Sequence, residues 1–212
     1  MIRRILLVCT GNTCRSPMAE AMLREMAKRR QVELEVRSAG VVALDGQPIS
    51  AHAAEALRKR NVPLPTGGAS SLKEDGVGWA DLILTMTVRH KEALLGRFPD
   101  AAGKTYTLKE YAFYQASSDG SQTAGDGGEA SSAADGPPDL DIADPFGGSL
   151  ELYEQSAEEI ARALERVLDR LVSSGEVAPA AGDDSGDGAA ENGVAGTEAA
   201  EANPAGAGEV AD

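Results

Sequence analysis

The sequence is poor in aromatic residues, which make up 4% of its 212 positions, and it holds only two cysteines and two histidines. Two cysteines five positions apart do not resemble the disulfide framework of a secreted protein. In a reducing compartment such thiols are more often catalytic or redox-active. Long apolar runs are also missing: none approaches the ~18 residues that cross a bilayer. The four apolar residues after Arg4 are too few for a signal peptide. We therefore expect a cytoplasmic protein without a membrane partner.

Basic residues are missing from two long segments. Residues 115–143 contain six acidic and no basic side chains, and residues 173–212 contain nine acidic and no basic ones. The rest of the chain holds 19 acidic against 20 basic residues, so the two segments account for the net charge of −14. Without a basic stripe to bind phosphates, a nucleic-acid partner is not expected.

Both acidic segments are rich in Ser, Gly, Ala and Asp, and bury too little apolar surface to offset the cost of ordering. We therefore expect one domain over residues 1–172, with a disordered insertion at 115–143, followed by a disordered tail over 173–212. The insertion is interpreted as a passive loop, because closure cost rises slowly with length. The alternative is that it repels anionic substrates or caps a site. Unchanged turnover after deletion of residues 117–137 would favour the passive interpretation.

The remaining sequence alternates between short apolar runs and stretches with helical spacing. The apolar runs, and the alternating pattern at 34–38, predict strands, whereas the helical spacing predicts helices. The expected strands are 5–8, 34–38, 81–86 and 105–108, and the expected helices are 17–30, 51–60, 88–98 and 149–172. Strands that alternate with helices favour a parallel sheet covered on both faces, which is a three-layer α/β fold.

The segment between the first strand and the first helix carries the strongest chemical signal, and it reads Cys9-Thr10-Gly11-Asn12-Thr13-Cys14-Arg15-Ser16. Such a loop can wrap backbone N–H groups around an oxyanion, and the helix N-terminus adds partial positive charge. Gly11 permits a positive φ and Asn12 tolerates one. The planar fork of Arg15 matches two phosphoryl oxygens. The loop therefore predicts a phosphate site.

The same positive field favours the thiolate form of Cys9, which would make it a nucleophile. Ser16 is placed to donate a hydrogen bond to that sulfur and to stabilise it as a leaving group. The alternative is that Cys9 is a small buried apolar residue at a strand end. The Gly, Asn, Arg and Ser at fixed offsets, between a strand and a helix, favour the functional interpretation.

The stretch VCTGNTCRSPMAE resembles the signature of the low-molecular-weight protein tyrosine phosphatase family. The similarity extends to RSAG at 37–40, ADLILTM at 80–86, TLKEY at 107–111 and Asp144-Pro145-Phe146. The resemblance implies a four-stranded sheet in the order 2-1-3-4, of the phosphotyrosine protein phosphatase I type. It also implies that Asp144 is the general acid, that phosphorylated proteins are the substrates, and that Cys9 forms a phosphocysteine. No cofactor or metal is expected, and we expect a monomer. His52 and His90 are interpreted as ordinary surface or helix residues.

Two positions make the sequence most similar to the protein-arginine-phosphatase branch of that family. Thr13 stands where tyrosine-directed members usually carry a bulkier aliphatic residue, and its hydroxyl could bind a guanidinium group. Gly147 removes a second aromatic wall after Phe146, which could pack on the substrate's stem or guanidinium plane. The alternatives are that Thr13 is a loop spacer and that Phe146 is a core aromatic.

The second cysteine of the loop suggests redox regulation. In this family such a cysteine can close a disulfide with the nucleophile, which implies a Cys9–Cys14 pair that protects Cys9 from over-oxidation. The alternative is a structural role for Cys14.

Four other functions share part of this pattern of residues. A phosphotyrosine phosphatase differs only at Thr13 and Gly147. An arsenate reductase with an intramolecular thiol relay needs a further cysteine after Cys14, and the chain has none. A sugar-transport phosphocarrier has no use for Arg15 or Asp144. A non-catalytic phosphoprotein-binding module has no need of both Cys9 and Asp144.

Overall fold

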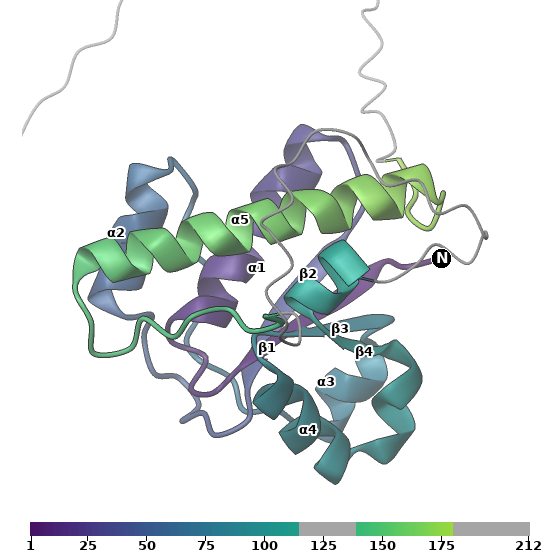
Figure 1. The fold of residues 1–212 in the computed structure, drawn as a ribbon, viewed down its shortest axis with the longest axis horizontal. Helices are drawn as coiled ribbons and strands as arrows, with labels where there is room; N and C mark the ends of the chain where they lie inside the picture. The colour runs from purple at the N-terminus through teal and green to yellow at the C-terminus, as the bar shows by residue number, and fades with distance from the viewer. Residues whose placement is uncertain (115–138, 180–212) are drawn as a thin grey trace, which may run out of the picture. The chain divides into compact units, whose positions relative to one another are not determined.

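A computed structural model describes residues 1–114 and 139–179 of the chain (Figure 1). The expectations of disorder for residues 115–138 and 180–212 lie outside these described ranges. Within the described residues, no helix combines the length and the apolar character that crossing a membrane requires.

A four-stranded sheet forms the centre of the fold, and its strands are β1 (Arg4–Cys9), β2 (Glu35–Gly40), β3 (Leu82–Thr85) and β4 (Thr105–Thr107). All neighbouring strands are parallel and their order is β2-β1-β3-β4, which confirms the predicted topology. Cys9, the last residue of β1, is in register with Gly40, the last residue of β2. Parallel strands end at the same edge of a sheet, so Cys9 lies at the edge where such folds bind ligands.

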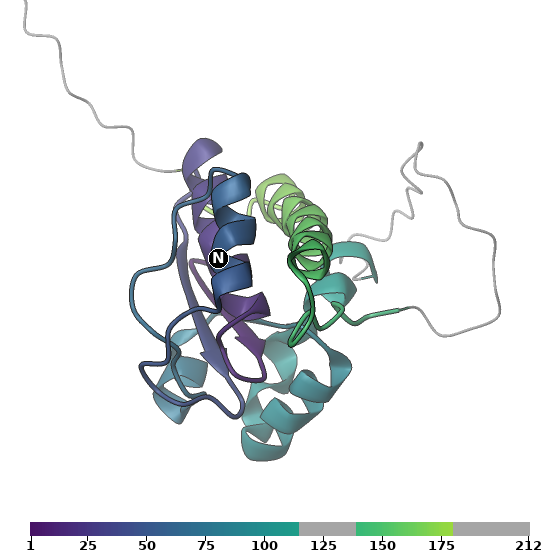
Figure 2. The same cartoon turned by 90° about the vertical axis from the view of Figure 1, so that its left-hand side faces the viewer.

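The helices cover both faces of the sheet (Figures 1 and 2). The first face carries α1 (Arg15–Arg29), α2 (Ala51–Lys59) and α5 (Leu150–Ser173), and α5 packs against both α1 and α2. The opposite face carries α3 (Glu74–Trp79) and α4 (Val88–Arg97). Strand β1 contributes side chains to the apolar cores on both faces of the sheet. Ile5 and Leu7 pack on the α5 side, whereas Leu6 and Val8 pack on the α4 side. This alternation is the period of two expected of a strand buried on both faces.

Helix α5 presents the apolar stripe that its sequence predicts. All seven predicted positions are buried, namely Tyr153, Ala157, Ile160, Leu164, Val167, Leu168 and Leu171. This helix closes one side of the core and its N-terminal end follows the Asp144 segment directly.

Three short helices were not predicted: α3, the 3₁₀ helix η1 (Pro99–Lys104) and the π-helix η2 (Glu110–Tyr114). Each has only five or six residues, which is too short for helical periodicity to be recognised in the sequence. Helix α3 also contains Gly76 and Gly78, which have poor intrinsic helix propensity.

The boundaries of the acidic segments also differ from the expectation. Ile142 belongs to the range expected to be disordered, yet it is only 1% exposed and packs in the core. Beyond α5, the carbonyl of Glu176 accepts a hydrogen bond from Ile2 N (2.6 Å), and that of Ala178 accepts one from Glu33 N (3.1 Å). The prediction rested on the polar composition of each whole segment, which does not reveal a few apolar residues near the segment ends.

Candidate active site

The predicted phosphate loop runs from the end of β1 into the first residue of α1. Its positive φ angle lies at Asn12 (φ 55°), which tolerates this conformation, and not at Gly11. Gly40 of β2 lies so close that an added Cβ would come within 2.5 Å of Thr10 O and 2.9 Å of Asn12 N. The absence of a side chain at Gly40 therefore lets the loop approach the neighbouring strand.

The side chain of Asn12 holds the loop in this shape. Its amide nitrogen donates to Ser16 Oγ (2.9 Å) and to Ser38 Oγ (2.8 Å), and its oxygen accepts from Ser70 N (2.7 Å). Ser38 in turn donates to the carboxylate of Glu20 at 2.5 Å. These buried and partly buried bonds join the loop, α1 and β2 into one hydrogen-bond network.

The sulfur of Cys9 is buried and lies in contact with two donors. Its Sγ atom lies 2.9 Å from Ser16 Oγ and 3.3 Å from Asn12 N. Ser16 Oγ already accepts a hydrogen from the Asn12 amide, which leaves the serine's own hydrogen to be donated to sulfur. This is the Ser16–Cys9 contact that the sequence predicts, and a thiolate at Cys9 would receive both hydrogen bonds.

The third predicted residue, Asp144, comes from a segment more than a hundred positions away and meets Arg15. Arg15 Nη2 donates to Asp144 Oδ2 at 2.7 Å, and Arg15 Nη1 donates to the carbonyl of Ile142 at 3.1 Å. The guanidinium is 4% exposed, whereas the carboxylate is 51% exposed. The structure therefore brings Cys9, Arg15 and Asp144 to one place, with the carboxylate open to solvent.

The Asp144 segment is held at several backbone and side-chain positions. Ile142 N donates to Met86 O at 2.8 Å, and Asp141 Oδ1 accepts from Val88 N at 2.7 Å. Ala143 N donates to Glu159 of α5 at 3.2 Å. The segment is thus attached to both α4 and α5, which fixes the carboxylate near the loop.

The residues expected to select the substrate lie around the loop and Asp144. Thr13 is half-buried, with its Oγ1 3.6 Å from Cys14 Sγ. Phe146 is 78% exposed, which excludes the alternative of a core aromatic. Gly147 has a φ of +75°, so the turn after Phe146 needs glycine for its backbone as well as for space.

Cys14 is buried next to the N-terminus of α1. Its Sγ lies 3.3 Å from Tyr153 OH and 3.5 Å from Ser50 Oγ, and both cysteines of the chain are free thiols. Tyr153 thus connects the first turn of α5 to the phosphate loop.

His90 was missed by the sequence interpretation, which took it for an ordinary surface or helix residue. It is buried in the first turn of α4, and its Nε2 atom lies 2.8 Å from Thr10 Oγ1, inside the phosphate loop. Burial, and then the positive charge of Arg15, lower the pKa of His90 to about 4, against the opposing effect of Asp144 and Asp141. His52, by contrast, is exposed on α2. The sequence held only a weak indication that His90 is buried. His90 lies four positions before Leu94, so the two residues share the buried face of α4.

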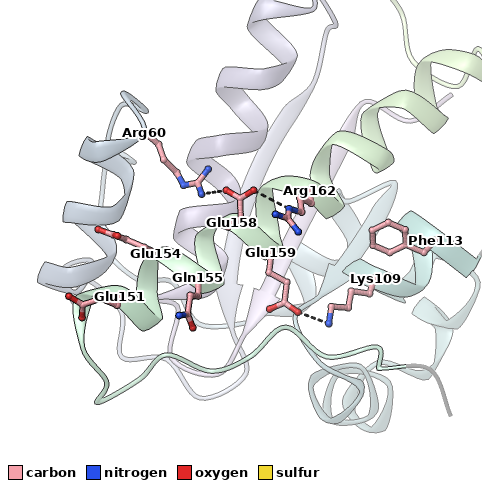
Figure 3. Close-up of a pocket in the computed structure, with 9 residues that line it drawn as sticks. All are labelled: Arg60, Lys109, Phe113, Glu151, Glu154, Gln155, Glu158, Glu159 and Arg162. Atoms are coloured by element: carbon pink, nitrogen blue, oxygen red, sulfur yellow. Dashed lines mark hydrogen bonds and ion pairs between the residues drawn. The ribbon is translucent and has the colours of Figure 1, made fainter. Parts of the chain in front are cut away.

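A pocket of about 640 Å³ lies elsewhere, along α5 (Figure 3). Five of its charged side chains pair with one another, since Glu158 pairs with Arg60 and Arg162 and Glu159 pairs with Lys109. None of the predicted site residues lines it. Glu159 links it to the site, because its carboxylate accepts a hydrogen bond from Ala143 N beside Asp144. Among residues 1–114 and 139–179, no three His, Cys, Asp or Glu side chains gather as a metal site.

The site combines a cysteine thiol in an anion-binding loop with an arginine and a carboxylate. Together these groups define the site of a cysteine-dependent phosphatase. Comparison with known proteins agrees. Residues 4–121 match the family described as low molecular weight phosphotyrosine protein phosphatase, and the chain belongs to that family.

Individual relatives span most of the chain. A protein-arginine-phosphatase of Geobacillus stearothermophilus is 38% identical over 79% of this chain and 95% of its own length. A low molecular weight protein-tyrosine-phosphatase, PtpB of Staphylococcus haemolyticus, is 38% identical over 74% of this chain and 91% of its own. Among solved structures, the YwlE arginine phosphatase, as a Cys-to-Ser mutant with a phosphorylated active-site serine, has a TM-score of 0.66. It is 35% identical over 80% of this chain and 95% of that one.

Proposed function

We propose that this protein hydrolyses phosphoarginine in proteins through a phosphocysteine intermediate. The observation that carries the proposal is the position of the buried Arg15 guanidinium, between the loop that holds Cys9 and the carboxylate of Asp144. The relatives named protein-arginine-phosphatase support this substrate.

In the first step, the Cys9 thiolate attacks phosphorus in line and the P–N bond to the arginine breaks. The loop amides of residues 10–14 and the Arg15 fork hold the equatorial oxygens, where charge develops. Protonated Asp144 gives its proton to the leaving nitrogen, so that arginine departs as a guanidinium rather than as a strong base. The hydrogen bonds from Ser16 and Asn12 favour the thiolate before attack.

In the second step, water attacks the phosphocysteine and the P–S bond breaks. Asp144, now a carboxylate, takes the proton from that water. The departing Cys9 thiolate is stabilised by Ser16, and inorganic phosphate leaves. The phosphorylated active-site serine in the related YwlE structure supports a covalent intermediate at this position. The 51% exposure of Asp144 is consistent with access by water.

Selection between substrates falls to Thr13, Gly147 and Phe146. We assign to the Thr13 hydroxyl a hydrogen bond with the guanidinium of phosphoarginine, and to exposed Phe146 a contact with that side chain. A phosphotyrosine phosphatase is the second candidate, because relatives of comparable identity carry that name. The choice of substrate therefore depends on these three positions rather than on the nucleophile.

The function is tested by phosphate release from a phosphoarginine peptide, with rapidly quenched samples analysed for a phosphoryl group bonded to the Cys9 sulfur. We expect turnover by the wild type, a trapped phosphocysteine, and loss of turnover in Cys9→Ser. The matched control is Cys14→Ser, which leaves the nucleophile in place. Binding without turnover would identify a phosphoprotein-binding module instead. Reduction of arsenate by the chain in place of peptide hydrolysis would favour the reductase.

We further propose that Cys9 and Cys14 form a reversible disulfide under oxidation. We also propose that the protein is a cytoplasmic monomer. Its partners in this proposal are phosphorylated proteins, and neither a nucleic acid nor a membrane is a partner. The closeness of the two thiols in the chain supports the redox proposal. A peroxide-treated sample should lose activity and regain it with dithiothreitol, whereas Cys14→Ser should lose activity irreversibly. Light scattering should give the molar mass of one chain at every protein concentration, which tests the proposed monomeric state.

A further inference from the structure

The first turn of α4 contacts both sides of the candidate active site. On one side, His90 Nε2 lies 2.8 Å from the side chain of Thr10, the residue after Cys9. On the other side, Val88 N and Met86 O hold Asp141 and Ile142 of the Asp144 segment at 2.7 and 2.8 Å. One short stretch of chain, residues 86–90, thus positions both halves of the site.

His90 is itself fixed on its other side. Thr87 caps α4, because its Oγ1 accepts from His90 N at 3.2 Å, and the same oxygen lies 2.9 Å from His90 Nδ1. Since Thr87 Oγ1 already accepts a backbone hydrogen, its own hydrogen is available for Nδ1. We assign the tautomer with the ring hydrogen on Nε2, in which Nδ1 accepts from Thr87 Oγ1 and Nε2–H donates to Thr10 Oγ1. A neutral imidazole satisfies every one of these bonds.

Thr10 is held from two directions. Its carbonyl accepts a hydrogen bond from Val42 N at 2.9 Å, next to the strand β2 where Gly40 gives the loop room. Its side chain is held by His90 from the α4 side. Because the peptide between Cys9 and Thr10 opens the phosphate loop, a residue that fixes Thr10 also fixes the first loop amide relative to the sulfur.

We propose that His90 is a positioning residue that holds the phosphate loop in its anion-binding shape through the side chain of Thr10. The inference rests on the proposed function, since it concerns the loop that would bind the phosphoryl group. His90 does not contact the reacting atoms. It acts as a neutral donor that fixes Thr10 and the loop amides before the substrate arrives.

The test measures inorganic phosphate binding without turnover. Iodoacetamide alkylates Cys9, phosphate protects it, and mass spectrometry locates the label and gives the half-protecting phosphate concentration. His90→Phe keeps a ring but removes both side-chain hydrogen bonds, and should raise that concentration roughly three- to tenfold, as the loss of one such bond predicts. His90→Gln keeps a donor near the Nε2 position and should restore most of the affinity.

The control separates positioning from general damage to the fold. Leu94→Val removes one buried methylene from the same face of α4 without touching Thr10, and should leave phosphate protection unchanged. Thr10→Val removes the partner, so His90→Phe should have no additional effect in that background.

Each result has a distinct meaning. A Thr10-dependent effect of His90→Phe, with rescue by His90→Gln, supports the inference. Equal phosphate protection in wild type and His90→Phe would overturn it, and so would an effect that persists in Thr10→Val. A wild type that phosphate does not protect at all would instead contradict the proposed function.

Discussion

Arg15 and Asp144 form an ion pair across the candidate active site, with Nη2 and Oδ2 separated by 2.7 Å, and the pair joins the start of α1 to a segment 129 positions later. The guanidinium is almost fully buried and the carboxylate is half-exposed. The residue assigned to bind the phosphoryl group is therefore partly neutralised by the residue assigned to donate the proton. A dianionic substrate must share Arg15 with Asp144 or displace the carboxylate.

Asp144→Asn should separate catalysis from phosphate binding. Loss of the proton donor should lower kcat for a phosphoarginine or phosphotyrosine peptide by roughly 10²- to 10⁴-fold. The freed Arg15 should bind inorganic phosphate more tightly, so the inhibition constant for phosphate should fall several-fold. Steady-state kinetics on the peptide gives kcat. The inhibition constant for phosphate is measured by competition against an aryl phosphate with a good leaving group, on which the variant keeps measurable activity.

An aryl phosphate with an acidic phenol serves as the control for that variant. Its leaving group needs little protonation, so Asp144→Asn should impair it far less than it impairs the peptide. Equal loss on both substrates would contradict the general-acid role of Asp144. Weaker phosphate binding in the variant would contradict the competition for Arg15.

Gly40→Ala should damage activity more than stability. The added Cβ would lie 2.5 Å from the Thr10 carbonyl, so the phosphate loop must shift away from β2. A shift of even an ångström in such a loop can cost about 10²-fold in kcat/KM, whereas overpacking costs about 1–3 kcal/mol of stability. Thermal unfolding and kcat/KM measured side by side check this prediction.

Gly96→Ala provides the matched change. Gly96 lies in α4, where an added Cβ meets no atom within 4 Å, and alanine should slightly stabilise the helix. Activity should be unchanged in this variant. If Gly40→Ala kept wild-type kcat/KM, the close approach of the loop to β2 would have no bearing on catalysis.

The buried His90 should make the fold less stable at acidic pH. Its folded pKa is about 4, below the ordinary value near 6.5 that the unfolded chain should show. Between these two pKa values the unfolded chain takes up a proton and the folded protein does not, so the free energy of unfolding falls as the pH falls. From pH 7.5 to 4.5 this linkage amounts to about 2.5 kcal/mol. The stabilising effect is complete above about pH 6.5 and is lost as the pH falls toward 4.

Urea unfolding at pH 7.5 and 4.5 measures that effect as the difference between wild type and His90→Gln. The variant should lose about 2–3 kcal/mol less than the wild type over this range. His52→Gln, at an exposed position, should lose as much as the wild type. Identical pH dependence of all three proteins would show that His90 is not buried as a neutral group.

Local patterns in the sequence predicted most of the fold. Apolar runs and, at 34–38, alternation identified the four strands, and helical spacing identified the four longer helices, including the whole buried stripe of α5. The motif Cys9 to Ser16 was recognisable because its residues are consecutive and lie between a strand and a helix. Asp144 was found only through the family resemblance, since nothing local connects it to Arg15.

The parts that escaped prediction depend on contacts between distant segments or on short structures. His90 contacts Thr10 across 80 positions, and no local pattern signals that a single polar residue in a helix will be buried. Glu20 is held by Ser38 of β2 in the same way. Ile142 was hidden by the polar composition around it, although its backbone and side chain join the site to the core.

Substrate preference tests the central claim most directly. The measurement compares kcat/KM for a phosphoarginine peptide and a phosphotyrosine peptide of matched sequence, in wild type and in Thr13→Ile. We predict that the wild type prefers phosphoarginine, and that Thr13→Ile shifts the preference toward phosphotyrosine by roughly 10-fold or more, because the guanidinium loses a hydrogen-bonding partner. A wild type that prefers phosphotyrosine, or a ratio that Thr13→Ile leaves unchanged, would contradict the assignment of Thr13 as the residue that selects arginine.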